Sequence, residues 1–244
     1  MAPIISTQGT STTTTKFAGD DSSYNENRIG TRLTYKLFTK LNTLAEFNVG
    51  KTNYETNVIG DSEFFESLFG VQFKETAKTT GIFKVGYRIR SYEEDQFDPF
   101  KGVVLSYESK TQLTASTLLS VLLRRSQEEA LVVNTNDIRN FYELNSIYFT
   151  ISRQLTSKIN ASFTNYYQFL DFPNVRSDTS TANDSNLEFF TYGFRPAINY
   201  KIHKWLFANF SYWYDNRSSD DNSNNTIASG WEKSVATFTI GATF

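Results

Sequence analysis

The chain contains no cysteine, and among its 244 residues there are only 1 histidine, 1 methionine and 4 prolines. Without cysteine, a disulfide framework, a thiol nucleophile and a cysteine-ligated zinc site are all excluded. The 24 basic and 26 acidic residues nearly cancel, so the chain has no excess positive charge for binding nucleic acid. No apolar run approaches the ~20 residues that a membrane-spanning helix needs.

Aromatic residues are abundant instead, with 22 Phe and 14 Tyr. From Arg28 onward they occur in segments where apolar and polar side chains alternate, and a period of two is the period of a β-strand. In 188–202, for example, Phe190 and Tyr192 share one face and Thr191 lies on the other. In 140–154 the pattern leaves the assignment of the two faces open. The predicted strands are 28–38, 43–54, 63–76, 81–92, 101–109, 112–125, 140–154, 158–171, 187–202, 204–215 and 231–244.

The segments that connect these strands are alternately short and long. The short links are 39–42, 77–80, 110–111, 155–157 and 203, and the long ones are 55–62, 93–100, 126–139, 172–186 and 216–230. Short turns at one end and long loops at the other are typical of up-and-down barrels in bacterial outer membranes, whose turns face the periplasm.

The direction of the strands predicts one more strand near the N-terminus. Counting back from the last strand, 28–38 must start outside, so a strand within 4–17 has to lead up to it. For 6–16 the alternative is a disordered tail. Because bacterial barrels usually have an even number of strands, we expect an all-β transmembrane antiparallel up-and-down β-barrel of about 12 strands. Residues 1–27 are then a Thr-rich N-terminal segment, a weak first strand with an outer loop over 19–27, and residues 28–244 form the transmembrane β-barrel.

The apolar face of the predicted strands indicates a membrane. On a closed cylinder these side chains would form a continuous belt, far larger than the few hundred Å² of apolar patch that soluble monomers tolerate. Lipid covers such a belt, and a closed barrel leaves no unpaired backbone at its edges. We therefore expect the bacterial outer membrane, with its lipid and lipopolysaccharide as surroundings. Aromatic residues near strand ends suit interfacial girdles: Tyr54, Tyr92, Tyr107, Trp205, Tyr214 and Trp231.

The last residues, 236–244 (ATFTIGATF), alternate apolar positions up to a terminal phenylalanine. They resemble the sorting signal of outer-membrane barrels, with Phe238, Ile240, Gly241 and Phe244 in the matching positions. The resemblance implies that the barrel assembly machinery recognises this segment.

Three further stretches carry a resemblance to a family. They are 85–92 (VGYRIRSY) with 98–102 (DPFKG), 123–129 (LRRSQEE), and 200–206 (YKIHKWL) with 211–217 (SYWYDNR). These stretches resemble the putative β-barrel porin family associated with exopolysaccharide biosynthesis and export. The resemblance implies an outer-membrane barrel at the exit of an exopolysaccharide export system, working with periplasmic components of that system.

Basic residues dominate the face that would line the lumen. The cations expected there are Arg28, Arg32, Lys36, Lys74, Lys84, Arg88, Arg90, Arg124, Arg195 and Lys201, against the carboxylates Glu46, Glu66 and Glu108. Two interpretations stay open. The charges can pair across neighbouring strands and stabilise a polar interior, or the surplus of cations can attract anionic solutes. Arg88 and Arg90 give the strongest support to the attraction of anionic solutes, because the guanidinium group suits carboxylate and phosphate.

Nothing in the sequence indicates an enzyme. The single histidine, His203, falls in the shortest predicted turn and not beside a nucleophile. The acidic stretches 93–95 and 220–221 could offer oxygen ligands to Ca²⁺, but their spacing fits no calcium loop. We predict no catalytic residues, no cofactor and no metal site. The predicted function is a narrow anion-leaning pore that serves exopolysaccharide export, and the alternative is a structural barrel with a closed lumen that docks a partner complex.

Overall fold

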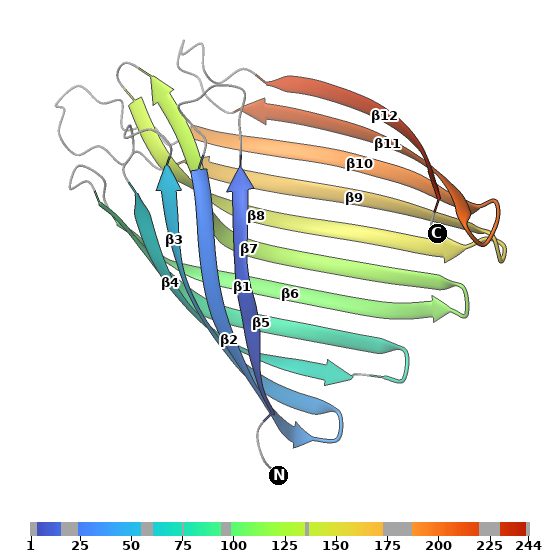
Figure 1. The fold of residues 1–244 in the computed structure, drawn as a ribbon, viewed down its shortest axis with the longest axis horizontal. Coiled ribbons are helices and arrows are strands. Elements are labelled where there is room, and N and C mark those ends of the chain that lie inside the picture. Colours follow the sequence, from blue (N-terminus) through green and yellow to red (C-terminus); the bar gives the residue numbers. More distant parts are fainter. Residues whose placement is uncertain are drawn as a thin grey trace.

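The computed structural model of the chain describes residues 4–15, 24–54, 61–74, 76–93, 99–134, 137–172, 187–219 and 230–242. These residues form one 12-stranded sheet in which every strand pairs with the next one in the sequence (Figure 1). All the pairings are antiparallel. The predicted all-β up-and-down fold of about 12 strands is therefore confirmed. Within those ranges we find no helical segment that could span a bilayer.

The strands are longer than those of an ordinary soluble sheet, whose commonest length is about 5–6 residues. They are β1 (Ile4–Thr15), β2 (Tyr24–Phe38), β3 (Leu41–Tyr54), β4 (Ser62–Lys74), β5 (Thr79–Tyr92), β6 (Phe100–Thr114), β7 (Thr117–Asn134), β8 (Asp137–Gln154), β9 (Ile159–Phe172), β10 (Leu187–Lys201), β11 (Leu206–Ser219) and β12 (Trp231–Ala242). Strands of this length suit a tilted crossing of a membrane.

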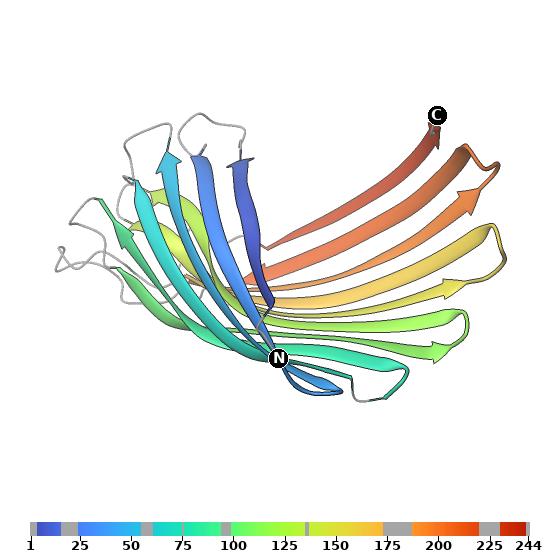
Figure 2. The ribbon, with the colours of Figure 1, turned by 60° about the horizontal axis from the view of Figure 1, so that its bottom comes forward.

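The sheet is strongly curved and has two free edges. In Figure 1 the first strands cross in front of the middle of the sheet, and Figure 2 shows β1 upright on one side while β12 sweeps away on the other. Among the described residues β1 and β12 do not pair with each other. The order of the strands is that of an up-and-down barrel, in which the last strand returns to the first.

The two faces of the sheet carry different side chains. On β5, Val85, Tyr87 and Ile89 are 40%, 43% and 37% exposed, whereas Arg88 and Arg90 are 6% and 2% exposed. We call the face that carries Val85, Tyr87 and Ile89 the outward face, and the face that carries Arg88 and Arg90 the inner face. The outward face continues through exposed aromatic and aliphatic residues of other strands, among them Phe47, Phe65, Phe69, Phe149, Phe163, Tyr167, Phe190, Tyr192, Phe238 and Ile240. This face is the apolar belt that the alternating pattern predicts.

Several details of the sequence prediction hold in the structure. A first strand does precede 28–38, as β1, although β2 already begins at Tyr24. Residues 19–23 of the predicted outer loop lie outside the described residues. In 140–154, Phe149 and Ile151 lie outward and Ser146 is buried on the inner face, which settles the assignment of the faces. The turn at His203 is confirmed, since its amide donates a 3.0 Å hydrogen bond to the carbonyl oxygen of Leu206.

The turn predicted at 110–111 is wrong. β6 continues to Thr114, so the turn consists of Ala115 and Ser116. Lys110 stays in the strand, where its Nζ lies 2.8 Å from a carboxylate oxygen of Glu108. Two small residues make the actual turn, in which the Ser116 amide donates to the Thr114 hydroxyl at 3.3 Å.

The long loop predicted over 126–139 is also wrong. β7 extends to Asn134 and β8 begins at Asp137, so these two strands continue far beyond the ends predicted for them. The polar run of 126–129 does not show the alternation of a lipid-facing strand, because these residues contact protein on the inner face.

Candidate functional site

The inner face of β2–β5 is held together by buried ion pairs. Glu66 on β4 accepts hydrogen bonds from Arg28 Nη2 at 3.0 Å, from Arg88 Nε at 2.9 Å and from Asn48 Nδ2 at 2.9 Å. The register puts Glu66 directly opposite Arg88, so the pairing follows from the strand alignment. The Glu66 side chain is buried, with 4% of its residue surface exposed. Its carboxylate therefore offsets positive charge of Arg28 and Arg88 that would otherwise face the lumen.

A second carboxylate, Glu46 on β3, repeats this arrangement nearer the short turns. It accepts hydrogen bonds from Arg32 Nε at 2.7 Å and from Lys84 Nζ at 3.3 Å. Glu46 lies opposite Arg32 in the register and is 3% exposed. Cross-strand pairs of opposite charge stabilise a sheet, and here each carboxylate serves two cations.

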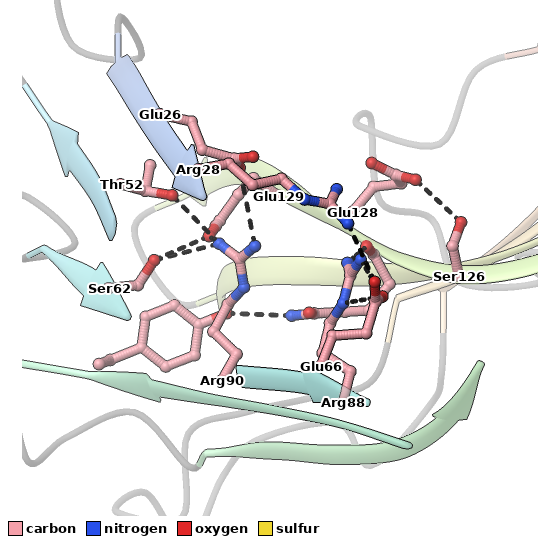
Figure 3. Close-up of polar contacts among 12 residues, drawn as sticks. Glu26, Arg28, Thr52, Ser62, Glu66, Arg88, Arg90, Ser126, Glu128 and Glu129 are labelled. Carbon is pink, nitrogen blue, oxygen red and sulfur yellow. Dashed lines mark hydrogen bonds and ion pairs between the residues drawn. The ribbon is translucent and has the colours of Figure 1, made fainter. Parts of the chain in front are cut away.

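Arg90, at the end of the sheet with the long connections, is the most deeply buried of the predicted lumen cations. Its guanidinium forms an ion pair with Glu129 and lies 3.8 Å from a carboxylate oxygen of Glu26. It also donates to the hydroxyls of Ser62 at 3.1 Å and Thr52 at 3.3 Å (Figure 3). Because Arg90 is only 2% exposed, its charge is compensated inside the protein and does not face open water.

Phe64 forms the apolar floor beneath these charges. The guanidinium carbons of Arg28, Arg88 and Arg90 lie 5.6, 5.2 and 4.9 Å from the centre of its ring. Arginine over an aromatic face is attracted by the ring quadrupole. The ring fits because Gly50 lies beneath it, where a Cβ would be 2.2 Å from the Phe64 ring.

Two tyrosines that we expected at the membrane interface point inward instead. The Tyr54 hydroxyl donates to Glu129 at 2.7 Å, and the Tyr92 hydroxyl accepts a 3.4 Å hydrogen bond from the Gln127 side chain. We placed these two tyrosines at the membrane interface because they lie near strand ends, without asking which face of the strand they occupy. The alternation of β3 and β5, continued by two residues, puts both side chains on the inner face.

A cavity of about 410 Å³ opens beside the ion pairs on the inner face. Its charged lining consists of six cations and two carboxylates: Arg28, Arg32, Lys84, Arg88, Arg124 and Arg125, with Glu46 and Glu66. Arg124 and Arg125 also have carboxylate partners outside the cavity lining, Glu128 at 2.6 Å and Glu143 respectively. The cavity is polar, and its direct lining carries more positive than negative groups.

The other half of the inner face holds Arg195 between aromatic rings. Its guanidinium carbon lies 4.2 Å from the ring centre of Trp213 and 4.8 Å from that of Tyr166. The Tyr166 hydroxyl donates a short hydrogen bond to Asp215, and its ring lies over Gly193, where a Cβ would be 2.5 Å from it. Arg195 is thus held by π-faces and not by a direct ion pair among the described residues.

Exposed lysines surround the end of the sheet that carries the short turns. We call them the basic collar: Lys36, Lys40, Lys74, Lys78, Lys158, Lys201 and Lys204. In the part of the chain that the structure describes, no carboxylate lies within ion-pair distance of these seven side chains. The predicted lumen cations therefore fall into three groups. Arg28, Arg32, Lys84, Arg88, Arg90 and Arg124 have carboxylate partners. Lys36, Lys74 and Lys201 lie exposed in the basic collar, and Arg195 lies between aromatic rings.

The segment predicted as an assembly signal lies on β12. Phe238 and Ile240 are 65% and 60% exposed on the outward face, and the Cα of Gly241 lies against the ring of Phe207. Phe244 lies outside the described residues. The role of this segment in assembly stays a prediction.

The sequence analysis missed the carboxylates Glu26 and Glu129 and the buried amide of Gln127. One signal was present, because the adjacent pair Phe64 and Phe65 breaks the alternation. Neighbouring aromatic residues in a strand point to opposite faces, and only one of those faces can meet lipid. An aromatic residue on the lumen side indicates that protein covers it there.

The described residues hold no group of three or more side chains that could bind a metal ion. His203 lies in its turn with its ring centre 5.3 Å from that of Trp205. The acidic residues 94–95 and 220–221 lie outside the described residues. That the chain is no enzyme and needs no cofactor stays a prediction.

Comparison with known proteins gives one result. A family model described as putative beta-barrel porin 2 matches residues 6–235. No curated protein and no solved structure matches the chain.

Proposed function

Since the chain belongs to the putative beta-barrel porin 2 family, we propose that it forms a narrow, anion-favouring pore across the bacterial outer membrane. The basic collar is the observation that carries this proposal. Its lysines are exposed and have no carboxylate partner in the described ranges, so their charge acts on solutes at the mouth of the pore. Charged linings of one sign raise the local concentration of counter-ions.

The orientation of the pore follows from its loops. Barrels of outer membranes keep their short turns in the periplasm, and the basic collar lies at the short turns. An anion leaving the periplasm meets the collar first and then the cavity lined by Arg32, Lys84 and Arg124. A barrel of twelve strands is wider than an eight-stranded barrel, whose interior is filled by side chains, and narrower than a porin of 16–18 strands. A pore of that width suits a small solute or an extended chain.

The permeant we propose is an exopolysaccharide chain that carries acidic groups. An extended chain fits a narrow pore, and carboxylate or phosphate groups suit lysine and arginine. The proposal includes periplasmic polysaccharide-export components as partners at the short-turn end, and the barrel assembly machinery during insertion. It assigns the protein no catalytic step.

Planar-bilayer recording of the reconstituted protein tests the proposal. Under a salt gradient, replacing Lys36, Lys74 and Lys201 by glutamine should move the reversal potential toward cation preference. The matched control replaces Lys101 and Arg153, exposed cations on the outward face, and should leave the potential unchanged. An acidic oligosaccharide should block the current more strongly than a neutral one of equal length. Equal reversal potentials in both variants would refute the anion preference.

A second function is favoured by a different observation. Gln127 is fully buried on the inner face, so protein fills part of the space that a solute would cross. We therefore keep a docking barrel with a closed lumen as the alternative, anchoring a partner complex in the outer membrane. A folded, reconstituted protein that carries no current would support it.

A further inference from the structure

The outer halves of β7 and β8 leave the wall of the sheet together. β7 pairs with β6 only as far as Arg125 opposite Leu105, and β8 pairs with β9 only as far as Glu143 opposite Asp171. The two strands nevertheless stay paired with each other up to Asn134 and Asp137. Residues 126–134 and 137–142 therefore form two paired strands that have no neighbour in the wall on either side. We call this pair of strands the inner arm.

Contacts of Glu129 show where the inner arm goes. Its carboxylate accepts hydrogen bonds from the Ser62 hydroxyl on β4 at 2.9 Å and from the Tyr54 hydroxyl on β3 at 2.7 Å. β4 is three strands away from β7 in the sheet, which corresponds to about 14 Å along a flat surface. A serine and a glutamate side chain cannot bridge that distance. The arm must have folded over the inner face to reach these strands.

Protein lies on both sides of the inner arm at Phe141 and Tyr142. Phe141 packs on Phe100 of β6, with ring centres 5.2 Å apart, and Tyr142 stacks on Phe172 of β9 at 4.9 Å. Adjacent residues of a strand point in opposite directions. The arm is thus wedged between the β6 side and the β9 side of the inner face.

The outward face is hollowed where the inner arm departs. A cavity of about 1040 Å³ runs across β5–β11, and its lining includes the outward residues Leu105, Arg125, Asn145 and Phe169. These residues form one row across the strands, at the level where pairing of β7 with β6 ends. A convex barrel wall has no such hollow, so it marks the point where β7 and β8 bend inward.

We infer that the inner arm is the constriction of the pore and sets the size of solute that can pass. This inference rests on the proposed function. The contacts that hold the arm to the wall include the ion pair of Glu129 with Arg90 and the 2.7 Å hydrogen bond from Arg88 Nη1 to the carbonyl oxygen of Gln127. Arg88 and Arg90 then serve as anchors of the arm, while the basic collar provides the charge that solutes meet.

Removing the inner arm tests this assignment. Replacing residues 127–143 by Asn-Gly joins Ser126 to Leu144 through a two-residue turn and keeps Ser126 opposite Leu144. The wall strands retain their partners, and heat-modifiable migration on gels checks that the variant folds. We expect a several-fold rise in single-channel conductance and entry of larger polyethylene glycols. An unchanged conductance and an unchanged size limit would overturn the inference.

A second variant covers the case in which the shortened chain does not fold. The protein has no native cysteine, so Ser62→Cys with Glu129→Cys gives two unique thiols, one on the wall and one on the arm. Loss of the Glu129 carboxylate should release the arm and raise the conductance. A short bifunctional thiol reagent should bring the conductance back to the wild-type level. Each single-cysteine variant treated with the reagent is the control, and failure of the reagent to restore the conductance contradicts the inference.

The outcomes separate the two proposals. If wild type conducts and neither variant differs from it, the constriction is refuted and the pore stands. If wild type is silent and the armless variant conducts, the arm closes the lumen completely. If wild type and both folded variants are silent, the pore proposal fails and the constriction fails with it.

Discussion

Arginine introduced at Phe149 should destabilise the protein far more than arginine at the next residue, Thr150. Phe149 lies near the middle of the wall portion of β8, on the outward face, and is 41% exposed. Thr150 points to the inner face, where its hydroxyl lies 2.9 Å from that of Thr164. The two positions share a strand and a depth in the membrane and differ in the face that they occupy.

The magnitudes follow from these surroundings. A charged side chain on the lipid face near the bilayer midplane costs about 2–4 kcal/mol. Thr150→Arg loses one hydrogen bond, about 1 kcal/mol, and its charge can extend into the polar interior. The difference of about 1–3 kcal/mol corresponds to roughly 5-fold to 150-fold in the unfolding equilibrium constant.

The measurement is urea unfolding of both variants in lipid vesicles, followed by tryptophan fluorescence and by gel mobility. Phe149→Leu and Thr150→Ser serve as controls, because they change side-chain size without adding charge. Equal free energies of unfolding for the two arginine variants would show that the faces of β8 are assigned wrongly.

Three further predictions concern the inner face and the belt. Glu66→Gln should cost about 3–5 kcal/mol because it leaves buried Arg88 without its carboxylate, whereas Glu66→Leu combined with Arg88→Met should cost much less in the same urea titration. Gly193→Ala should cost about 1–3 kcal/mol, since the new Cβ collides with the Tyr166 ring, and a smaller residue at 166 should remove that cost in a double-mutant cycle. The exposed aromatic belt should make extraction depend on detergent and give faster migration on unheated gels; a monodisperse protein without detergent would contradict the membrane assignment.

Alternation predicts the wall of the fold because lipid on one side and polar lumen on the other impose a period of two. β5 follows that rule from Phe83 to Arg90. The rule fails in the inner arm, where Gln127, Glu129, Phe141 and Tyr142 all contact protein and no side needs to be uniformly apolar. The turn at 115–116 was missed because Ala115 and Ser116, two small residues, do not interrupt the strand pattern around them.

The paired cations could be placed on the inner face from the sequence, but not their partners. Glu46 on β3 lies opposite Arg32 on β2, and Glu66 on β4 lies opposite Arg88 on β5. The register alone therefore brings each pair together. Glu129 reaches Arg90 only because the arm leaves the wall, and no local pattern encodes that departure. Contacts within a sheet can therefore be derived from periodicity, while contacts across the lumen depend on the three-dimensional course of one hairpin.

The inner arm also has a consequence for folding kinetics. Wall pairing joins consecutive strands only, so each step closes a short loop. The bond from Tyr54 to Glu129 spans 75 residues and that from Ser62 spans 67, so docking of the arm needs the wall strands β3–β8 in place. Contacts of such sequence separation form late. Changes at Glu129 should therefore accelerate unfolding and leave the rate of folding almost unaltered.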